Sequence, residues 1–324
     1  MSKTLKIILI ILAVLLLLGG AAAIFFNHYV GKMNLVEEET EVSSDAIAAA
    51  AEKTDIALPT ETMQEDNGIV NILLLGTDFR IPNTEDPGRA DCTMICSVNK
   101  GTGSVKLISI ERGIYVPLPE GYGYWWQDQD LITHVYHWGG ANLSESIVRQ
   151  CFNIDLAGYA QVDFEGFRNV IDAIGGIDIA LTDSEASRTQ SAPYYNAETG
   201  LYHLDGQHAL NFARLRAIDS DWHRIERQRK VIAAALDKLK KLPISEFNDL
   251  ADTVLPLINT NLSKAEIAAL LLAAPKVLKN LSVEQMTVPD YNWQNNYIKC
   301  DFNYESKKIS NFIYDTGYEI ESPY

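Results

Sequence analysis

The chain has 324 residues, of which 47% are apolar and 22% are charged, and its formal net charge is -16. This apolar content is enough to bury the core of one large domain or two small ones, which excludes a disordered protein. The acidic excess argues against a nucleic-acid partner, because binding to a phosphate backbone needs a surplus of Lys and Arg over the contact surface.

An uncharged apolar run, IILIILAVLLLLGGAAAIFF, occupies residues 7–26. As a helix it would span roughly 30 Å, which is enough to cross the hydrocarbon core of a membrane. Lys3 and Lys6 precede the run, so residues 1–6 are expected to be a short cytoplasmic tail and the rest of the chain to lie outside the cell. The alternative is a cleaved signal peptide that ends at the small residues 21–23, but the run is longer than the usual apolar core of such a peptide. We therefore expect a single-pass membrane anchor.

The next segment, residues 27–68, is strongly acidic. It holds ten acidic residues and two lysines, with an Ala-rich stretch in its middle. Such a composition is typical of a solvated segment. We expect a juxtamembrane stalk, helical at most in part, that leads to a folded domain at residues 69–324.

From Ile69 onward, strand and helix patterns alternate. The predicted strands are 69–75, 92–98, 104–110, 157–162, 177–181 and 286–289, and the predicted helices are 142–152, 163–176, 205–216, 222–242, 263–278 and 305–316. Asn142 with Glu145 matches a capping box, and Asp163 is expected to cap the following helix. The alternation predicts an α/β protein with a three-layer α/β/α sandwich around a mixed central sheet.

The four cysteines do not form a disulfide scaffold. Cys92 and Cys96 fall on one face of a predicted strand, roughly 13 Å apart, which is too far for a bridge. Their spacing is not C-x-x-C, and neither His134 nor His137 has a partner in a metal-binding pattern. A zinc site is therefore not expected.

Positive charge is concentrated in the stretch RLRAIDSDWHRIERQRK, which holds five of the eleven arginines. Asp221 is the expected N-cap of a helix, with Arg224 in the first turn and Arg227 one turn later on the same side. Cations at a helix N-terminus oppose its dipole, and a bound phosphate would offset this by accepting from backbone N–H groups and guanidinium groups together. The alternative is ion pairing with nearby carboxylates.

Two acidic residues and one arginine are expected at the ends of the first three strands. Asp78 follows the first strand, Asp91 precedes the second, and Arg112 follows the third. In α/β sheets, ligands collect at the carboxyl ends of the strands, and this set suits Mg²⁺ bridging to phosphate oxygens. The alternative is that both acids only cap turns.

Aromatic residues are dense in the stretches GYGYWWQDQD and HVYHWGG. Exposed Trp and Tyr beside an active cleft stack on sugars or line an apolar groove. The alternative is ordinary packing in the core.

These motifs together resemble the LytR-CpsA-Psr family of membrane-anchored cell-wall glycopolymer ligases. The matching stretches are NILLLGTDFR, GRADCT, SIERG, THVYHWGG, QVDFEGFRNVIDAIGGIDI and LDGQHALNFARLRAIDSDWHRIERQR, in the family's order from Asn71 to Arg229. The ensemble is specific, although each motif alone is weak.

The resemblance implies a phosphotransferase that moves a phosphate-linked glycopolymer from a polyprenyl pyrophosphate carrier to peptidoglycan. It implies Mg²⁺, or Mn²⁺, at Asp78 and Asp91, and a supporting role for Asp221 in orienting arginines. The residues it places around the pyrophosphate are Arg80, Arg112, Arg214, Arg216, Arg224, Arg227 and Gln228, and its catalytic residues are Asp91, Arg112 and Arg214. It also implies an apolar tunnel for the polyprenyl chain.

One motif departs from the family pattern. The family commonly has SIPRD, whereas this chain has Glu111 and Gly113 on either side of Arg112. Asp91 is therefore the candidate base for activating the acceptor hydroxyl. Two other functions remain open at this stage: a polyprenyl-pyrophosphate hydrolase that uses water, and a non-catalytic protein that binds anionic wall polymers.

Overall fold

The computed structural model describes residues 30–36, 42–78, 87–215, 221–241, 243, 246–280, 282–289, 293–294, 297–298 and 300–323. The apolar run at residues 7–26 lies outside the described residues, so the expected membrane anchor stays a prediction. Within the described part of the chain, no helix has the length and apolar character needed to cross a membrane.

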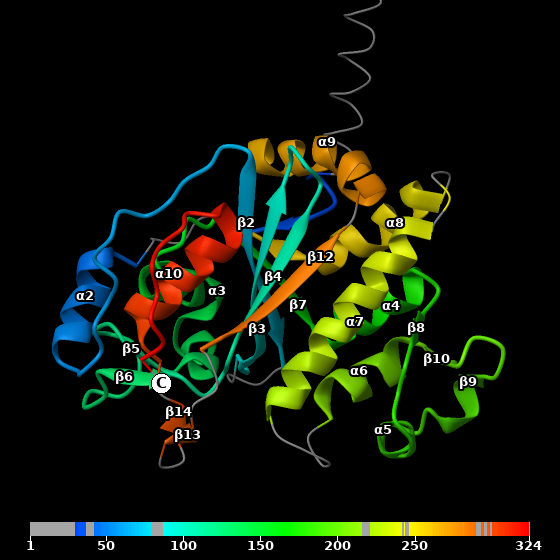
Figure 1. Ribbon diagram of the computed structural model, residues 1–324, viewed down its shortest axis with the longest axis horizontal. Coiled ribbons are helices and arrows are strands. Elements are labelled where there is room, and N and C mark those ends of the chain that lie inside the picture. Colours follow the sequence, from blue (N-terminus) through cyan, green and yellow to red (C-terminus); the bar gives the residue numbers. More distant parts are fainter. Residues whose placement is uncertain are drawn as a thin grey trace, which may run out of the picture.

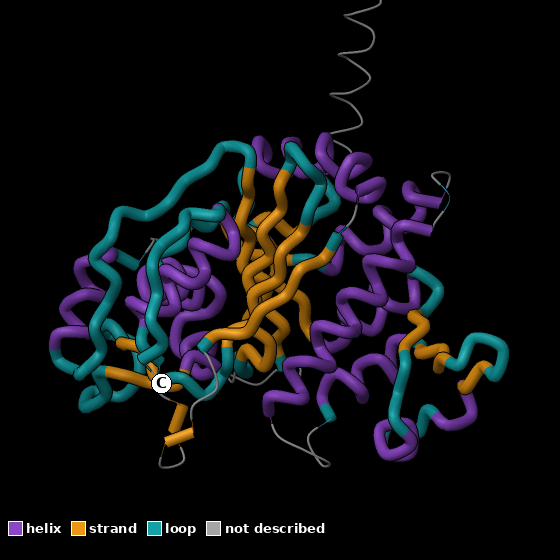
Figure 2. Tube along the Cα trace, in the orientation of Figure 1, coloured by secondary structure: helices purple, strands orange, loops and turns teal. Residues whose placement is uncertain are grey.

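A seven-stranded mixed sheet forms the centre of the molecule (Figures 1 and 2), in the order β1-β11-β7-β2-β3-β4-β12. The strands are β1 (Asn34–Leu35), β2 (Ile69–Thr77), β3 (Ala90–Asn99), β4 (Val105–Ile110), β7 (Gly158–Asp163), β11 (Asn259–Thr260) and β12 (Val283–Val288). β2 is parallel to β7 and antiparallel to β3, and β12 is parallel to β4. The predicted mixed α/β fold is confirmed.

Helices cover both faces of this sheet, as Figure 1 shows. One face carries α3 (Ile132–Phe152) and α10 (Phe302–Tyr314), and α2 (Ser44–Glu52) packs against α3 on the side away from the sheet. The other face carries α4 (Phe164–Ala173), α6 (Gly206–Arg214) and α7 (Asp221–Lys241), with α8 (Phe247–Val254) beside α4. The remaining helix α9 (Lys264–Asn280) precedes β12 at one end of the sheet, and α5 (Asp183–Arg188) lies near the opposite end.

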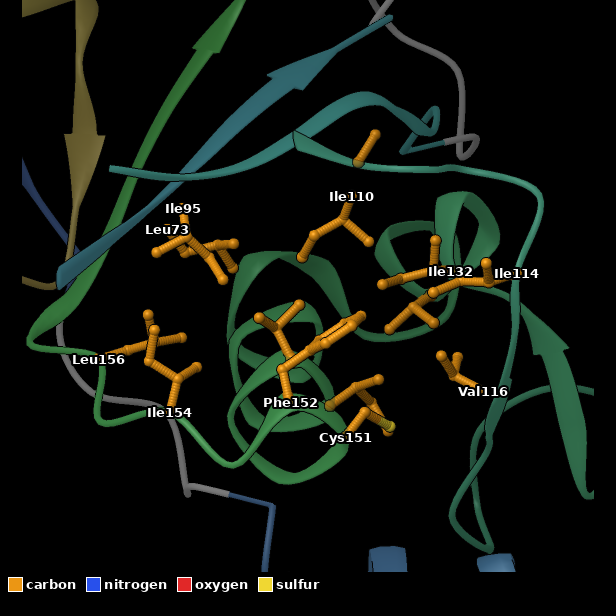
Figure 3. Close-up of a cluster of buried hydrophobic side chains, with 14 of the residues drawn as sticks. Leu73, Ile95, Ile110, Ile114, Val116, Ile132, Cys151, Phe152, Ile154 and Leu156 are labelled. Atoms are coloured by element: carbon orange, nitrogen blue, oxygen red, sulfur yellow. The ribbon is translucent and has the colours of Figure 1, made fainter. Parts of the chain in front are cut away.

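The larger core fills the space between the sheet and α3. Figure 3 shows Leu73 and Ile95 of the sheet above Phe152 of α3. These three side chains are fully buried, and the ring of Phe152 packs edge-on against Phe302 of α10 at 5.4 Å. Burial of a large apolar side chain of this kind stabilises the fold by about 1.5–3 kcal/mol.

Smaller sheets lie at the edges of the domain. A three-stranded sheet consists of β8 (Ile177–Ile179), β10 (Leu201–Leu204) and β9 (Tyr195–Asn196). Two hairpins consist of β5 (Tyr115–Pro117) with β6 (Gln129–Leu131), and of β13 (Trp293–Gln294) with β14 (Tyr297–Ile298). The sequence patterns indicated only β8 among these strands.

The described part of residues 27–68 differs from the solvated stalk that its composition suggests. Ser43 caps α2 by accepting a hydrogen bond from the backbone of Ala46. Ile47, Ala50 and Ala51 are buried against the domain. The spacing i, i+3, i+4 puts these three on one face of the helix, so the Ala-rich stretch buries an apolar stripe while its charged residues face water.

The capping box expected at Asn142 and Glu145 is wrong. α3 begins at Ile132 and continues through Gly139 and Gly140, whose backbone angles are non-helical and kink the helix. Glu145 accepts hydrogen bonds from Arg149 and Asn261, both at 2.8 Å, and takes no capping role. The aromatic stretch before the glycine pair therefore belongs to the first segment of this helix.

Candidate functional site

A cavity of about 410 Å³ lies between the sheet and the helices α4, α6 and α7. Its walls are mostly apolar side chains of β2, β7 and these helices. The polar side chains that line it are Asp91, Cys92, Asp163, Arg214, Arg224 and Gln228.

The polar residues gather at one end of the cavity because of the sheet topology. β2 and β7 are parallel, so both end at the same edge, and β3 begins there because it is antiparallel to β2. Asp91 starts β3 and Asp163 ends β7, while Leu74 and its strand partner Ala160 lie further along the same strands. The cavity therefore has a polar mouth and an apolar interior.

A β-bulge brings Asp91 into this cavity. Gly76 pairs with Cys92, but the next residue, Thr77, pairs with Ala90, so Asp91 is an extra residue in β3. Without the bulge, Asp91 and Cys92 would point to opposite faces of the sheet; with it, both line the cavity. A side chain at Gly76 would place its Cβ atom 3.0 Å from the Cβ atom of Cys92, so a small residue fits here.

Asp91 and Arg112 lie together, as the sequence predicts. A guanidinium Nη1 of Arg112 donates to Oδ1 of Asp91 at 3.2 Å, and both side chains are half-buried or more. Arg112 lies two residues after the end of β4, so this pair joins the end of β4 to the start of β3 across the edge of the sheet. A partly exposed pair of this kind contributes little to stability.

Asp78 closes the loop between β2 and β3. Its Oδ1 atom accepts from the backbone N–H of Arg89 at 2.6 Å, and its own N–H donates to the Arg89 carbonyl at 3.0 Å. The side chain is 8% exposed and does not line the cavity. Asp78 therefore holds this loop closed through hydrogen bonds to the backbone, which is the alternative to metal binding given above.

The acidic residues also fit a magnesium ion shared with a phosphate. Asp78 directly follows Thr77, the last residue of β2, and its backbone is bonded to Arg89, two residues before Asp91. Over the described ranges, no cluster of three or more His, Cys, Asp or Glu side chains could hold a metal by itself. Mg²⁺ commonly takes one or two carboxylates and completes its ligands with substrate phosphates, which is the arrangement these two residues allow.

Two arginines line the mouth from the helices. Arg214, in the last turn of α6, places its guanidinium 4.2 Å from the centre of the Phe164 ring. Arg224, in the first turn of α7, is only 2% exposed, and Gln228 follows one helical turn later. Burial raises the pKa of the Cys92 thiol to about 11, and the nearby positive charge of Arg224 opposes that rise.

Arg227 differs from the expectation that it faces the pyrophosphate. Its guanidinium donates to Oε1 of Glu185 at 3.3 Å and to the backbone carbonyl of Leu215 at 2.7 Å. The side chain is 2% exposed and does not line the cavity. Viewed along the helix axis, Gln228 lies about 40° from Arg224 in one direction, and Arg227 lies about 60° from Arg224 in the opposite direction. It therefore anchors α7 to α5.

The remaining predicted residues cannot be placed. Arg80 and Arg216 lie outside the described residues, and so does the side chain of Asp221, although α7 begins at that residue. Sequence reasoning assigned Asp163 only as a helix cap and Cys92 only as a strand residue. Asp163 does cap α4, with Oδ1 accepting from Gly166 at 2.7 Å, and it also faces the cavity. Its position directly after the predicted strand 157–162 was the available signal.

Comparison with known proteins places this architecture in a family. The family model LytR_cpsA_psr matches residues 32–316. A curated relative from Oceanobacillus iheyensis, named polyisoprenyl-teichoic acid–peptidoglycan teichoic acid transferase TagU, is 34% identical over 218 residues. That alignment covers 64% of this chain and 64% of the relative, so the chain spans slightly less than two thirds of the relative's length.

Solved structures share the fold at lower identity. The structure titled TagT bound to LIIa-WTA has a TM-score of 0.61 and 24% identity, covering 79% of this chain and 96% of that one. A structure of the LytR-CPS2A-psr family protein YwtF (TagT) with bound octaprenyl pyrophosphate lipid has a TM-score of 0.55 and 22% identity, covering 78% of this chain and 94% of that one. Since the family model covers most of the chain, from the first described strand to beyond α10, this protein belongs to the LytR_cpsA_psr family.

Proposed function

We propose that this protein transfers a phosphate-linked glycopolymer from a polyprenyl pyrophosphate carrier to peptidoglycan. The polymer is a teichoic acid, a capsule or another secondary wall polymer. The observation that carries the proposal is the cavity, whose mouth is lined by Arg214, Arg224 and Asp91 and whose interior is apolar. A polyprenyl pyrophosphate has the same two parts, a charged head and a long apolar chain.

The names of relatives support this substrate class. The Oceanobacillus relative is named for transferring teichoic acid from a polyisoprenyl carrier to peptidoglycan. One similar structure holds octaprenyl pyrophosphate lipid. An extracellular reaction also agrees with an anchor at residues 7–26, which would hold the domain at the outer surface of the cell membrane.

The chemistry is a displacement at phosphorus. An acceptor hydroxyl oxygen of peptidoglycan forms a bond to the phosphorus that carries the sugar, and the bond from this phosphorus to the bridging oxygen breaks. Polyprenyl phosphate leaves with that oxygen, and Asp91 accepts the hydroxyl proton. Arg112, Arg214 and Arg224 stabilise the negative charge that spreads over the phosphoryl oxygens.

A divalent cation has a place in this site. Asp78 and Asp91 would hold Mg²⁺, or Mn²⁺, together with oxygens of the pyrophosphate. When bound, the ion would neutralise phosphate charge. Removal of divalent cations with a chelator is expected to lower transfer, and added Mg²⁺ to restore it.

The test measures covalent transfer by the purified full chain supplied with lipid-linked glycan, peptidoglycan fragments and Mg²⁺. Arg224→Ala is expected to lower the rate by about 10²–10³, the usual effect of removing one preorganised donor, and Asp91→Ala by at least as much. Leu272→Ala is the matched control, because Leu272 is 84% exposed on α9, away from the cavity.

Two outcomes would contradict the proposal. Transfer that is unchanged in Asp91→Ala would remove the central assignment. Release of polyprenyl phosphate at the same rate with and without peptidoglycan would identify a hydrolase that uses water as acceptor.

A further inference from the structure

A tight turn between β5 and β6 presents two tryptophans to solvent. The backbone N–H of Gln127 donates to the carbonyl of Tyr124 at 2.9 Å, which closes a turn with Trp125 and Trp126 at its centre. Trp125 is 92% exposed, Trp126 is 62% exposed and Tyr124 is 57% exposed. Contiguous large rings in water are unfavourable for an isolated domain and mark surfaces that bind something.

The rings of this turn are held in a fixed arrangement. Tyr124 stacks on Trp126 with ring centres 4.9 Å apart and an angle of 3° between the planes. Tyr124 also meets the edge of Trp138 at 5.2 Å, and the Trp138 Nε1–H donates to Asp130 at 2.7 Å. Ordering of these side chains before binding lowers the entropy cost of holding a ligand.

The backbone around the turn is also fixed. Leu118 is 1% exposed, and its N–H donates to the carbonyl of Asp128 at 2.9 Å. Lys53 of the segment after α2 lies 3.4 Å from the carboxylate of Asp128. The turn is thus a rigid projection of the domain.

The same hairpin connects this turn to the proposed reaction site. β5 starts three residues after Arg112, and Thr133, just after β6, donates through its hydroxyl to the carbonyl of Ala90 at 2.8 Å. The backbone N–H of Thr133 also donates to the carbonyl of Arg112 at 3.4 Å, so the base of the hairpin is bonded to Arg112 and to Ala90, the residue before Asp91. Residues 112–118 can span at most roughly 20 Å, and a Cβ atom at Gly123 would lie 2.4 Å from the Leu118 side chain, so the backbone next to the aromatic turn lies within roughly 25 Å of Arg112.

We propose that Tyr124, Trp125 and Trp126 form a carbohydrate-binding platform for a glycan strand that extends from the reaction site. A pyranose ring has an apolar face of C–H groups that packs on an aromatic ring, and its hydroxyl and amide groups need polar partners at the rim. Glu120, which is exposed in the same loop, offers a carboxylate acceptor. The occupant is the peptidoglycan acceptor strand, because the phosphate-linked donor polymer is anionic and the turn is acidic. This choice rests on the proposed function, whereas the binding of sugar does not.

Charge favours a glycan over a lipid bilayer as the occupant. Residues 118–128, LPEGYGYWWQD, contain two acids and neither Lys nor Arg. Segments that lie in a membrane interface combine aromatic residues with cations, because the surface is usually anionic. An acidic turn would be repelled from such a surface.

The first experiment measures binding of a soluble N-acetylglucosamine tetramer to the full chain by calorimetry and tryptophan fluorescence. The double variant Trp125→Ala/Trp126→Ala is expected to bind about tenfold more weakly or to lose binding, since two ring contacts are removed. Trp125→Tyr/Trp126→Tyr keeps aromatic faces and is expected to retain most of the affinity, and Leu272→Ala all of it. Equal binding by the wild type and the alanine variant, or none by the wild type, would overturn the platform.

The second experiment tests the assignment to the acceptor strand. In the transfer assay, the alanine variant is expected to raise KM for peptidoglycan with little change in kcat; a raised KM for the lipid-linked polymer instead would overturn the assignment to the acceptor strand. If the wild type shows no transfer, the proposed function fails, while the tetramer titration still tests whether the platform binds sugar.

A third measurement tests membrane contact, through the tryptophan fluorescence of the chain in vesicles of brominated phosphatidylglycerol. Quenching that the alanine variant abolishes would overturn the carbohydrate assignment in favour of a membrane contact.

Discussion

Arg224 and Arg227 lie three residues apart on α7 and are each 2% exposed, yet they serve different regions of the molecule. Arg224 lines the mouth of the cavity, whereas Arg227 binds Glu185 and the carbonyl of Leu215 behind it. A rotation of about 60° around the helix axis separates the two regions. Burial and charge therefore do not tell which arginine lines the cavity; the direction of its side chain from the helix does.

The largest effect is expected when Arg227, the arginine bound to Glu185, is removed. Arg227→Ala leaves the buried carboxylate of Glu185 without its cation, so we expect the free energy of unfolding to fall by about 3–5 kcal/mol. Urea denaturation followed by circular dichroism measures it. Arg224→Ala is the matched control, and a stability loss as large as that of Arg227→Ala would show that both arginines are structural.

A smaller effect is expected at the cap of α5, which holds the partner of Arg227. Thr182 and Glu185 form a capping box, in which Glu185 Oε2 accepts from the Thr182 backbone at 2.9 Å while Oε1 receives Arg227. Thr182→Ala is expected to lower the free energy of unfolding by about 1 kcal/mol, and Thr182→Ser to preserve it. If Thr182→Ala had no effect on the melting temperature, Glu185 would be positioned by other contacts.

The smallest effect is expected for the influence of the Arg224 charge on the reactivity of Cys92. Thiolate is the form that reacts with iodoacetamide, and burial raises the pKa of Cys92 to about 11, so alkylation of Cys92 should rise about tenfold per pH unit between pH 8 and 10. Arg224→Met removes the positive charge that lowers this pKa while keeping most of the side-chain volume. We expect slower labelling of Cys92 in that variant by mass spectrometry.

Leu272→Ala serves as the control for the labelling experiment, because Leu272 is exposed on α9 and does not line the cavity. It should leave the rate of Cys92 labelling unchanged. Faster or equal labelling in Arg224→Met would place the guanidinium away from the thiol and outside the cavity mouth.

The sequence predicts the elements that local signals define. The apolar run at 69–75 is the core of β2, and Asp163 caps α4 as its position before the helix pattern suggests. α9 begins as predicted, because Ser263 and Glu266 exchange hydrogen bonds at its start. The helical segment before the glycine pair in α3 was missed, because the sequence pattern predicted a helix only from residue 142, whereas α3 begins at Ile132 and continues through non-helical Gly139 and Gly140.

The candidate site is predictable only in part, since it depends on register and rotation. The pairing of Asp91 with Arg112 follows from strand order, because both lie at one edge of the sheet. The entry of Asp91 into the cavity depends on a bulge, which shifts the strand alternation by one residue. The place of Arg227 depends on Glu185, which is distant in sequence and carries no motif that links it to α7.

The two hydrogen bonds between Asp78 and Arg89 have a consequence for how the protein can vary. They tie both ends of the intervening segment at its base, so changes of length within that segment need not be transmitted to Asp91 or to the sheet. Changes of sequence between these two positions are thus a route by which the preference for different polymers can diverge while β2 and β3 keep their pairing.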